Sequence, residues 1–195
     1  MTRVDQVQPV DAPLPSDGNP RSAASYALRS GYADDLHDLW RLYNGIVAEG
    51  SFTGHLDPLP LSDRRRWLEG HLDPRFPLIV ASDDLGIVGY ATISPWREGR
   101  RALDGTVEAS VFLAPRARGR GLGRKLLTEI VSKARALGHE KILAIVFDTN
   151  AASLGLLESL GFERWGHLPG TATLPTGRCG HFMLGFDLLA AGAGR

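Results

Sequence analysis

The sequence predicts an α/β (α+β) fold in which a mixed, mostly antiparallel central sheet is flanked by helices. The first observation is the order of the periodic segments, which runs from two helices through a β meander to alternating strands and helices. The second is the turn signal Asp83-Asp84 between two short apolar runs, which is typical of an antiparallel hairpin. The third is Ile142 to Phe147, a continuous apolar run of strand length that indicates a central strand covered on both faces.

Chain length and composition indicate one folded domain. At 195 residues, with 43% hydrophobic and 23% charged residues, the chain can bury a single hydrophobic core. Residues 1–24 contain four prolines among small and polar residues, and such a segment buries too little apolar surface to offset the entropy of ordering. The sequence therefore predicts a flexible, Pro-rich N-terminal tail over residues 1–24 and a single domain over residues 25–190.

The first half of the domain should begin with two helices. Asp34 and Asp35 lie where acids favour a helix start, and apolar residues then recur at helical spacing as far as Val47. A second, shorter helix starts at Ser62, after a stretch that contains Gly and Pro. Three strands are expected next, at Leu78 to Ala81, Gly86 to Ile93 and Thr106 to Leu113.

The second half should alternate helices and strands. A helix from Gly121 to Gly138 places its apolar residues on one face and its charged residues on the other. After the central strand, Asn150 can cap a helix from Ala151 to Leu160, which Gly161 can end. The closing strands are expected at Phe162 to Trp165 and His181 to Leu188.

Charge, cysteine and histidine content argue against several classes of protein. The 22 Lys and Arg balance 22 Asp and Glu, so the formal net charge of +0 provides no overall field for nucleic acid or an anionic membrane. The one cysteine, Cys179, can form no intramolecular disulfide, and the six histidines show no metal-binding spacing. No apolar run approaches the roughly 20 residues of a membrane span. We therefore expect a cytoplasmic protein without a metal, nucleic-acid or membrane partner.

A basic, glycine-rich loop carries the strongest functional signal. The strand Thr106 to Leu113 leads through Ala114-Pro115 into a turn that opens a helix, so several backbone N–H groups and the helix dipole should point at one spot. The turn's glycines let an anion approach the backbone, and its cations add positive charge. These residues are Gly119, Gly121 and Gly123, with Arg116, Arg118, Arg120, Arg124 and Lys125 around them. The loop therefore predicts a phosphate site.

Other interpretations of this loop remain open from its residues alone. A basic loop with glycines is often only a solvated helix start. It does not match a P-loop, because no Gly-Lys-Ser/Thr follows at the required spacing, and residue 124 is Arg where a dinucleotide fingerprint needs glycine. Nucleic-acid binding by the arginine cluster is also open, although no aromatic residues for base stacking are interleaved with it.

The motifs resemble those of the GNAT N-acetyltransferase superfamily. Arg118-x-x-Gly121-x-Gly123 resembles the family's acyl-CoA pyrophosphate loop, and Asn150-x-x-Ser153 and Leu160-Gly161-Phe162 resemble its later motifs. Thr106-Val107-Glu108 is most similar to phosphinothricin acetyltransferases and related amino-acid N-acyltransferases. The resemblance implies acetyl-CoA as acyl donor and a small primary amine, an amino acid or an analogue, as acceptor by direct attack. It also implies the family's fold, and relatives often form homodimers.

The same resemblance assigns roles to individual residues. It implies that Glu108 is the base that takes the amine's proton, whereas without it an acid on a solvent-facing strand would be the better interpretation. Asn150 would contact the cofactor, although its position also suits a helix cap. Glu49 and Phe52 lie in a loop that the family uses as a wall of the acceptor site. The remaining implied cofactor contacts are Val111, Phe112 and Leu113 along the strand and Arg118, Gly119, Arg120, Gly121, Leu122 and Gly123 in the loop.

Two departures from the family pattern leave part of the chemistry unassigned. Leu157 stands where many members carry a Tyr that protonates the leaving thiolate, so the sequence names no general acid. The segment Gly177 to His181 also differs from that of the nearest relatives, which predicts a different acceptor. Leu157 favours an alternative, in which the chain is a non-catalytic acyl-CoA-binding or regulatory module.

Overall fold

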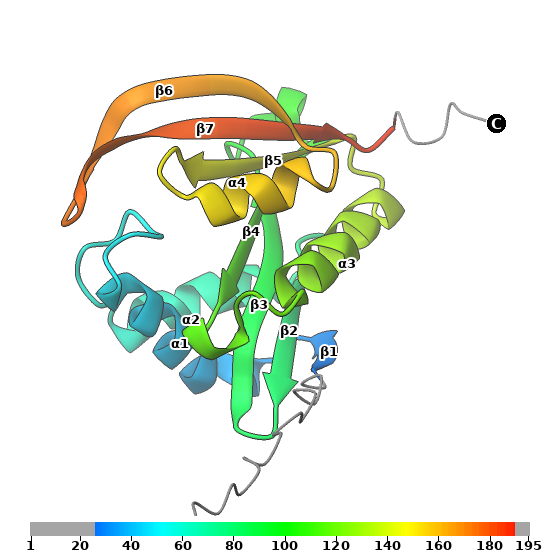
Figure 1. Cartoon of the computed structure of the whole chain (residues 1–195). Coiled ribbons are helices and arrows are strands. Elements are labelled where there is room, and N and C mark those ends of the chain that lie inside the picture. The colour runs from blue at the N-terminus through cyan, green and yellow to red at the C-terminus, as the bar shows by residue number, and fades with distance from the viewer. Residues whose placement is uncertain (1–25, 190–195) are drawn as a thin grey trace, which may run out of the picture.

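The computed structural model describes residues 26–189 (Figure 1). The predicted tail over residues 1–24 and residue 190 at the predicted end of the domain lie outside the described residues. In chain order the elements are β1 (Ala27–Ser30), a 3-10 turn (Ala33–Asp35), α1 (Leu36–Ala48), α2 (Leu61–Gly70), β2 (Leu78–Asp83), β3 (Gly86–Pro95), a 3-10 turn (Arg101–Leu103), β4 (Thr106–Leu113), a 3-10 turn (Pro115–Ala117), α3 (Leu122–Ala136), β5 (Lys141–Phe147), α4 (Ala151–Glu158), β6 (Glu163–Leu174) and β7 (Gly177–Asp187).

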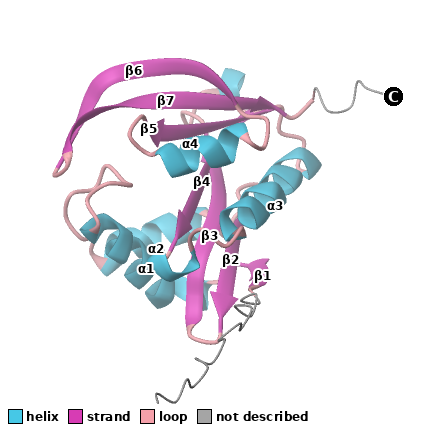
Figure 2. Cartoon of the chain, in the orientation of Figure 1, coloured by secondary structure: helices cyan, strands magenta, loops and turns pink. Residues whose placement is uncertain are grey.

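The strands form one sheet of seven, in the order β1-β2-β3-β4-β5-β7-β6, which confirms the mixed, mostly antiparallel fold (Figure 2). Every neighbouring pair is antiparallel except β4 and β5. Buried residues of α3 and α4 form one core cluster with the sheet, whereas those of α1 and α2 form a second cluster with β2 and β3. The helices therefore cover the sheet from two sides.

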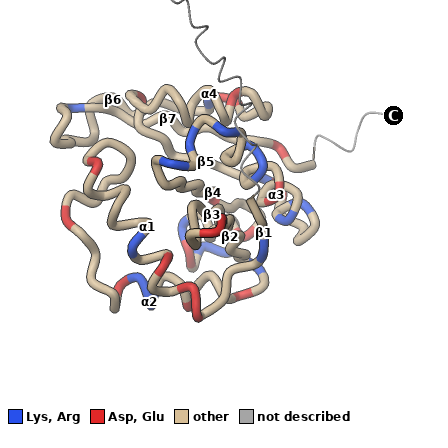
Figure 3. The backbone as a smooth tube through the Cα atoms, turned by 60° about the horizontal axis from the view of Figure 1, so that its bottom comes forward, with Lys and Arg blue, Asp and Glu red and all other residues tan. Residues whose placement is uncertain are grey.

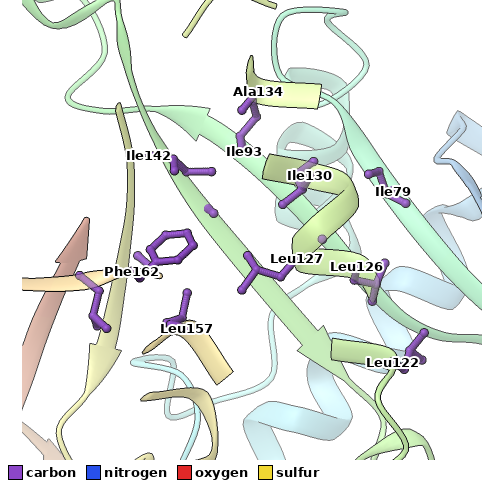
Figure 4. Close-up of a cluster of buried hydrophobic side chains, with 14 of the residues drawn as sticks. Ile79, Ile93, Leu122, Leu126, Leu127, Ile130, Ala134, Ile142, Leu157 and Phe162 are labelled. Carbon is purple, nitrogen blue, oxygen red and sulfur yellow. The ribbon is translucent and has the colours of Figure 1, made fainter. Parts of the chain in front are cut away.

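The core beneath α3 confirms the amphipathic pattern of this helix. Leu122, Leu126, Leu127 and Ile130 are almost fully buried, and Figure 4 shows them in one cluster with residues of the strands, among them Ile79, Ile93 and Ile142. Arg124, Lys125 and Glu129 are exposed on the opposite face, and Lys133 is half-exposed. Gly138 follows the helix with φ +83°, the left-handed conformation expected of a glycine at this position.

The sheet opens between its two parallel strands. Only Thr106, Val107 and Glu108 of β4 pair with β5, opposite Lys141 to Leu143. Beyond Glu108 the two strands separate, while β4 stays paired with β3 and β5 stays paired with β7. The remaining length of β4 therefore has one edge without a neighbouring strand.

Two strand predictions need correction. The first strand, β1, was not predicted, because three of its four residues are exposed and carry no apolar alternation. The closing strands are far longer than predicted, since β6 and β7 form a hairpin that arches away from the rest of the sheet (Figure 1). Much of β6 is exposed, and register shifts interrupt the hairpin around Gly166 and between Leu168 and Ala172, so hydrophobic periodicity could not reveal it.

Candidate active site

A cleft of about 680 Å³ occupies the opening between β4 and β5. Its walls come from β4, β5, the N-terminal end of α3, the α4 helix and the loop after α1. The structure thus brings together the predicted residues Glu108, Val111, Phe112, Leu113, Arg118, Gly119, Gly121, Gly123, Asn150 and Phe52. Arg120, Leu122 and Glu49 were also predicted, but they do not line the cleft.

The glycine-rich loop takes the shape that an anion site needs. Gly119 and Gly121 have φ of +69° and +77°, so both adopt a left-handed conformation that costs other residues about 1–2 kcal/mol. A Cβ added at Gly121 would point into open space. The N–H groups in the first turn of any helix have no intrahelical acceptor. In α3 no side chain of the described residues caps them either. The positive end of the helix therefore faces the cleft without a protein partner.

Gly123 is needed for a different reason. This residue is helical and buried, and an added Cβ would lie 3.0 Å from Leu156 of the α4 helix. The glycine thus lets α3 and α4 pack closely beside the cleft. Leu122, next to it, is fully buried in the core, so its side chain supports the loop and only its backbone can serve a ligand.

Hydrogen bonds with the protein fix the orientation of the Arg118 side chain. Its Nη1 and Nη2 each donate to a carboxylate oxygen of Glu49 at 2.6 Å, and its Nε and Nη2 donate to the carbonyl oxygen of Leu113 at 3.1 and 2.9 Å. The guanidinium also lies 4.7 Å from the ring centroid of Phe52. These contacts join the end of α1 to the glycine-rich loop. They also give Glu49 a partner, so a contact of Glu49 with the acceptor would have to compete with Arg118.

Not all the predicted cations are free to meet a phosphate. Arg116 forms an ion pair with Asp83, and Arg124 donates a hydrogen bond to Ser159. Within the described residues, Arg120 and Lys125 form no ion pair and are exposed. Elsewhere Lys and Arg alternate with Asp and Glu around the molecule (Figure 3), so positive charge is a local property of this loop.

Glu108 lies where the pairing of β4 with β5 ends. Its side chain shares a face of β4 with Ser110 and Phe112, and it lines the cleft. Burial raises the pKa of the Glu108 carboxyl above the ordinary glutamate value. Among the described residues, no side chain forms a hydrogen bond or ion pair with this carboxylate. A half-buried carboxylate without a partner, at the narrow end of a cleft, can accept a proton from a bound ligand.

Asn150 has the structural role that its position suggested. Its side-chain oxygen accepts a hydrogen bond from the Ser153 N–H at 3.1 Å and so caps α4. The residue also lines the cleft. The cap is therefore present, and the cofactor contact stays a prediction.

The two departures from the family pattern both reach this cleft. Leu157 is 6% exposed and lines the wall with a hydrocarbon side chain that cannot donate a proton. His181, which the sequence did not single out as a site residue, also lines the cleft; its Nδ1 lies 2.9 Å from the Thr171 hydroxyl, and its ring packs on Phe147. Cys179 is buried in a small cluster with Phe147 and Leu174. The sequence marked the segment Gly177 to His181 as a departure from the family pattern but did not predict His181 at the cleft, where the pairing of β7 with β5 places it opposite Phe147.

Two further features of the described residues concern metals and membranes. Over residues 26–189 no three His, Cys, Asp or Glu side chains gather closely enough to hold a metal ion. In the same range no helix combines the length and the apolar character that a membrane crossing requires.

Comparisons with known proteins agree with this geometry. Residues 34–162 match the model of the Acetyltransferase (GNAT) family. A methionine sulfoximine/methionine sulfone acetyltransferase of Pseudomonas paraeruginosa is 37% identical over 74% of this chain and 84% of its own length. An L-amino acid N-acyltransferase of Escherichia coli is 31% identical over 75% of this chain and 85% of its own. The crystal structure of a phosphinothricin acetyltransferase of Sinorhizobium meliloti in complex with acetyl-CoA is 29% identical and aligns with a TM-score of 0.78, covering 83% of this chain and 88% of that one.

Proposed function

Because the chain belongs to the acetyltransferase (GNAT) family, we propose that it transfers the acetyl group of acetyl-CoA to the primary amine of an amino acid or a close analogue. The chain is an acetyl-CoA-dependent N-acetyltransferase. The observation that carries the proposal is the cleft between β4 and β5, which has an uncapped helix end on one side and the unpartnered Glu108 carboxylate at its narrow end.

Two backbone surfaces of the cleft suit acetyl-CoA. The N–H groups of Gly119 to Gly123 and the dipole of α3 provide a site for its pyrophosphate, and Arg120 and Lys125 add exposed charge nearby. The edge of β4 from Val111 to Leu113 has no strand beside it on the β5 side, so the peptide groups that face this edge can bond the amides of the pantetheine arm. The Leu113 carbonyl is the exception, because it already accepts hydrogen bonds from Arg118. The thioester would then lie deeper in the cleft, towards Glu108.

The reaction requires the loss of a proton from the acceptor. An alkylammonium has a pKa near 10 and cannot attack a thioester until it is deprotonated. Glu108 accepts this proton directly or through water, and the neutral amine forms a C–N bond as the C–S bond breaks. The nitrogen then loses its second proton to water or to the departing thiolate, which leaves the neutral amide. Coenzyme A leaves as a thiolate, whose conjugate thiol has a pKa of roughly 8.5, so it can depart without a protein acid. Leu157 is consistent with this route, which involves a ternary complex and no acetyl-enzyme.

The similarity to amino-acid acetyltransferases supports an acceptor that carries an α-amine. The relatives named above act on methionine sulfoximine, methionine sulfone, L-amino acids or phosphinothricin, which all present a primary amine on a small skeleton. The reaction would take place in the cytoplasm, where acetyl-CoA is available and where the lone Cys179 stays reduced.

A kinetic screen with product analysis tests the proposal. Thiol release from acetyl-CoA would be followed with L-methionine sulfone, L-methionine sulfoximine, phosphinothricin and the common L-amino acids, and mass spectrometry would identify the products. Polyamines and aminoglycosides would serve as amine controls of other classes. We expect N-acetylation of at least one amino acid or analogue. Acetylation of the control amines alone would contradict the acceptor class, and release of coenzyme A without an acetylated amine would contradict the reaction.

A further inference from the structure

A second pocket, of about 430 Å³, lies between the sheet and the helices α1 and α2. Its floor is the outer part of β3 and β4, where Tyr90, Thr92 and Ser94 pair with Phe112, Ser110 and Glu108. Ser110 and Phe112 line both this pocket and the acetyl-CoA cleft. The two cavities therefore share a wall on the face of β4 that carries Glu108.

Arg64 of α2 places a buried cation in this second pocket. The residue is 3% exposed, and its guanidinium carbon lies 3.5 Å from the ring centroid of Trp67 and 4.9 Å from those of Tyr43 and Tyr90. Its Nε and Nη2 are buried without a hydrogen-bond partner. In the described chain no carboxylate forms an ion pair with it. Aromatic rings stabilise such a cation in part, but buried donors without a partner destabilise the folded protein until an acceptor binds them.

The neighbouring charged and polar groups leave Arg64 without an anion. Asp63 lies beside it in sequence but forms its ion pair with Arg66 at 3.6 Å. His71 Nδ1 donates to the carbonyl oxygen of Trp67 at 2.7 Å, and its buried Nε2 has no partner. Burial and the nearby Arg64 charge lower the pKa of His71, so at neutral pH its ring does not add a second cation. The pocket thus presents one buried positive charge that the protein itself does not balance.

The distance from this charge to Glu108 suits a small bifunctional molecule. Tyr90, beneath the guanidinium, and Ser94, opposite Glu108, are four residues apart on β3, which corresponds to roughly 13 Å at about 3.3 Å per residue. Hydrogen bonds of about 3 Å at each end leave roughly 7 Å between them. A molecule of amino-acid size can place an amine near one end and an acidic group near the other.

We propose that Arg64 binds an acidic group of the acceptor, a carboxylate or a similar oxyanion, while the acceptor's amine lies near Glu108. The proposal rests on the function proposed above and names the feature by which the enzyme recognises its acceptor. A guanidinium donates two parallel hydrogen bonds to a carboxylate, and such a pair would satisfy donors that are otherwise unpaired. The acid is one on the acceptor's side chain, because the α-carboxylate is bonded to the same carbon as the α-amine and cannot reach Arg64 while the amine lies near Glu108.

Calorimetric titration of the protein saturated with coenzyme A tests this without requiring turnover. L-glutamate and L-glutamine differ only at the side-chain acid, and L-methionine sulfone and its carboxamide, which differ only at the α-carboxylate, are the control pair. We expect L-glutamate to bind about tenfold or more tightly than L-glutamine. Equal affinities for L-glutamate and L-glutamine would overturn the proposal. A preference found only in the control pair would contradict it too, because it would place the recognised acid beside the amine.

Two variants test whether Arg64 is the source of the preference. Arg64→Met keeps an unbranched side chain on Trp67 and should remove the difference between acid and amide, whereas Arg65→Met changes the exposed neighbour and should retain it. The Tm and the acetyl-CoA affinity of each variant report folding. A preference that persists in folded Arg64→Met would overturn the proposal. If Arg64→Met does not fold, the wild-type comparison still decides whether an acid is recognised. Binding without acetylation would contradict the proposed function alone.

Discussion

The two halves of the site are built in different ways. On the acetyl-CoA side, the functional groups are backbone N–H groups and an unpaired strand edge, supplied by consecutive residues from Val111 to Gly123. On the acceptor side, they are side chains from α2, β3 and β4, far apart in the sequence. Under the proposed roles, one short segment suffices to bind acetyl-CoA, whereas recognition of the acceptor depends on how distant segments of the fold come together.

The largest effect should follow from blocking the backbone surface. Gly121→Glu places a charged side chain in the open space of the loop, and we expect acetyl-CoA affinity to fall by about 100-fold or more because steric exclusion adds to charge repulsion. Gly138→Glu is the matched control, since Gly138 also has a positive φ and open space but lies at the far end of α3. Similar affinities for the two variants in calorimetric titration would contradict the anion site.

Removing the proposed base should have the next largest effect. Glu108→Gln should lower kcat by about 100-fold, within the usual range for general base catalysis, and leave acetyl-CoA affinity unchanged. Glu163→Gln, on an exposed part of β6, is the control. Because the folded state raises the pKa of Glu108, the folded protein holds this proton more tightly than the unfolded chain, and the ionised carboxylate lowers stability at neutral pH. The Tm of Glu108→Gln should therefore not fall below that of the wild type. Full turnover by this variant would show that Glu108 is not the catalytic base.

The pH dependence of kcat/KM should also report the ionisation of Glu108, with a smaller effect than the substitution. Only the ionised Glu108 carboxylate accepts a proton, so kcat/KM should rise with pH through its pKa and fall about tenfold for each unit below it. Since burial raises this pKa, the acid limb should lie above the ordinary glutamate value of about 4.3. A pH profile without an acid limb, or one unchanged in Glu108→Gln, would argue against this assignment.

The smallest effect concerns the link between the two halves. The Glu49 and Arg118 side chains are about a quarter and a third exposed, so their ion pair should contribute about 1 kcal/mol. Glu49→Gln and Arg118→Met should each weaken acetyl-CoA binding by about five-fold, because the loop loses its tie to α1. A double-mutant cycle should show the two effects to be non-additive. Additive effects would mean that Arg118 contacts acetyl-CoA independently of Glu49.

The sequence predicted the elements of the acetyl-CoA side well because they are local, whereas their contacts with acetyl-CoA stay a prediction. The strand Thr106 to Leu113, the turn and the helix of the phosphate site follow one another in the chain, so periodicity and glycine spacing reveal them together. The family resemblance then predicted Glu108 as the base, whereas its position in the sequence alone favoured an acid that faces solvent. The pairing of Glu49 with Arg118 could not be predicted, because 69 residues separate the partners and either charge could have faced solvent.

Arg64 shows how little of the proposed acceptor side could be predicted from the sequence. It is the first of three consecutive arginines, of which Arg65 and Arg66 are exposed. Helical spacing places Arg64 on the same face as Leu61 and Leu68, but an arginine on such a face commonly extends its charge to solvent, so the spacing alone did not predict a buried guanidinium. Only the packing of α2 against β3 turns this one guanidinium onto Trp67 and Tyr90. His181 presents the same difficulty, since it reaches the cleft through the pairing of β7 with β5, two strands that are far apart in the sequence.

The central claim is direct transfer from acetyl-CoA to an amino-acid amine in the cleft between β4 and β5. Its most direct test is mass spectrometry of both the intact protein and the small molecules after a brief reaction of wild type with acetyl-CoA and L-methionine sulfone, with Glu108→Gln in parallel. The account predicts an acetyl group on the amine of the amino acid, none on the protein, and strongly reduced product for Glu108→Gln. An acetylated protein intermediate, or equal product from the two proteins, would contradict it.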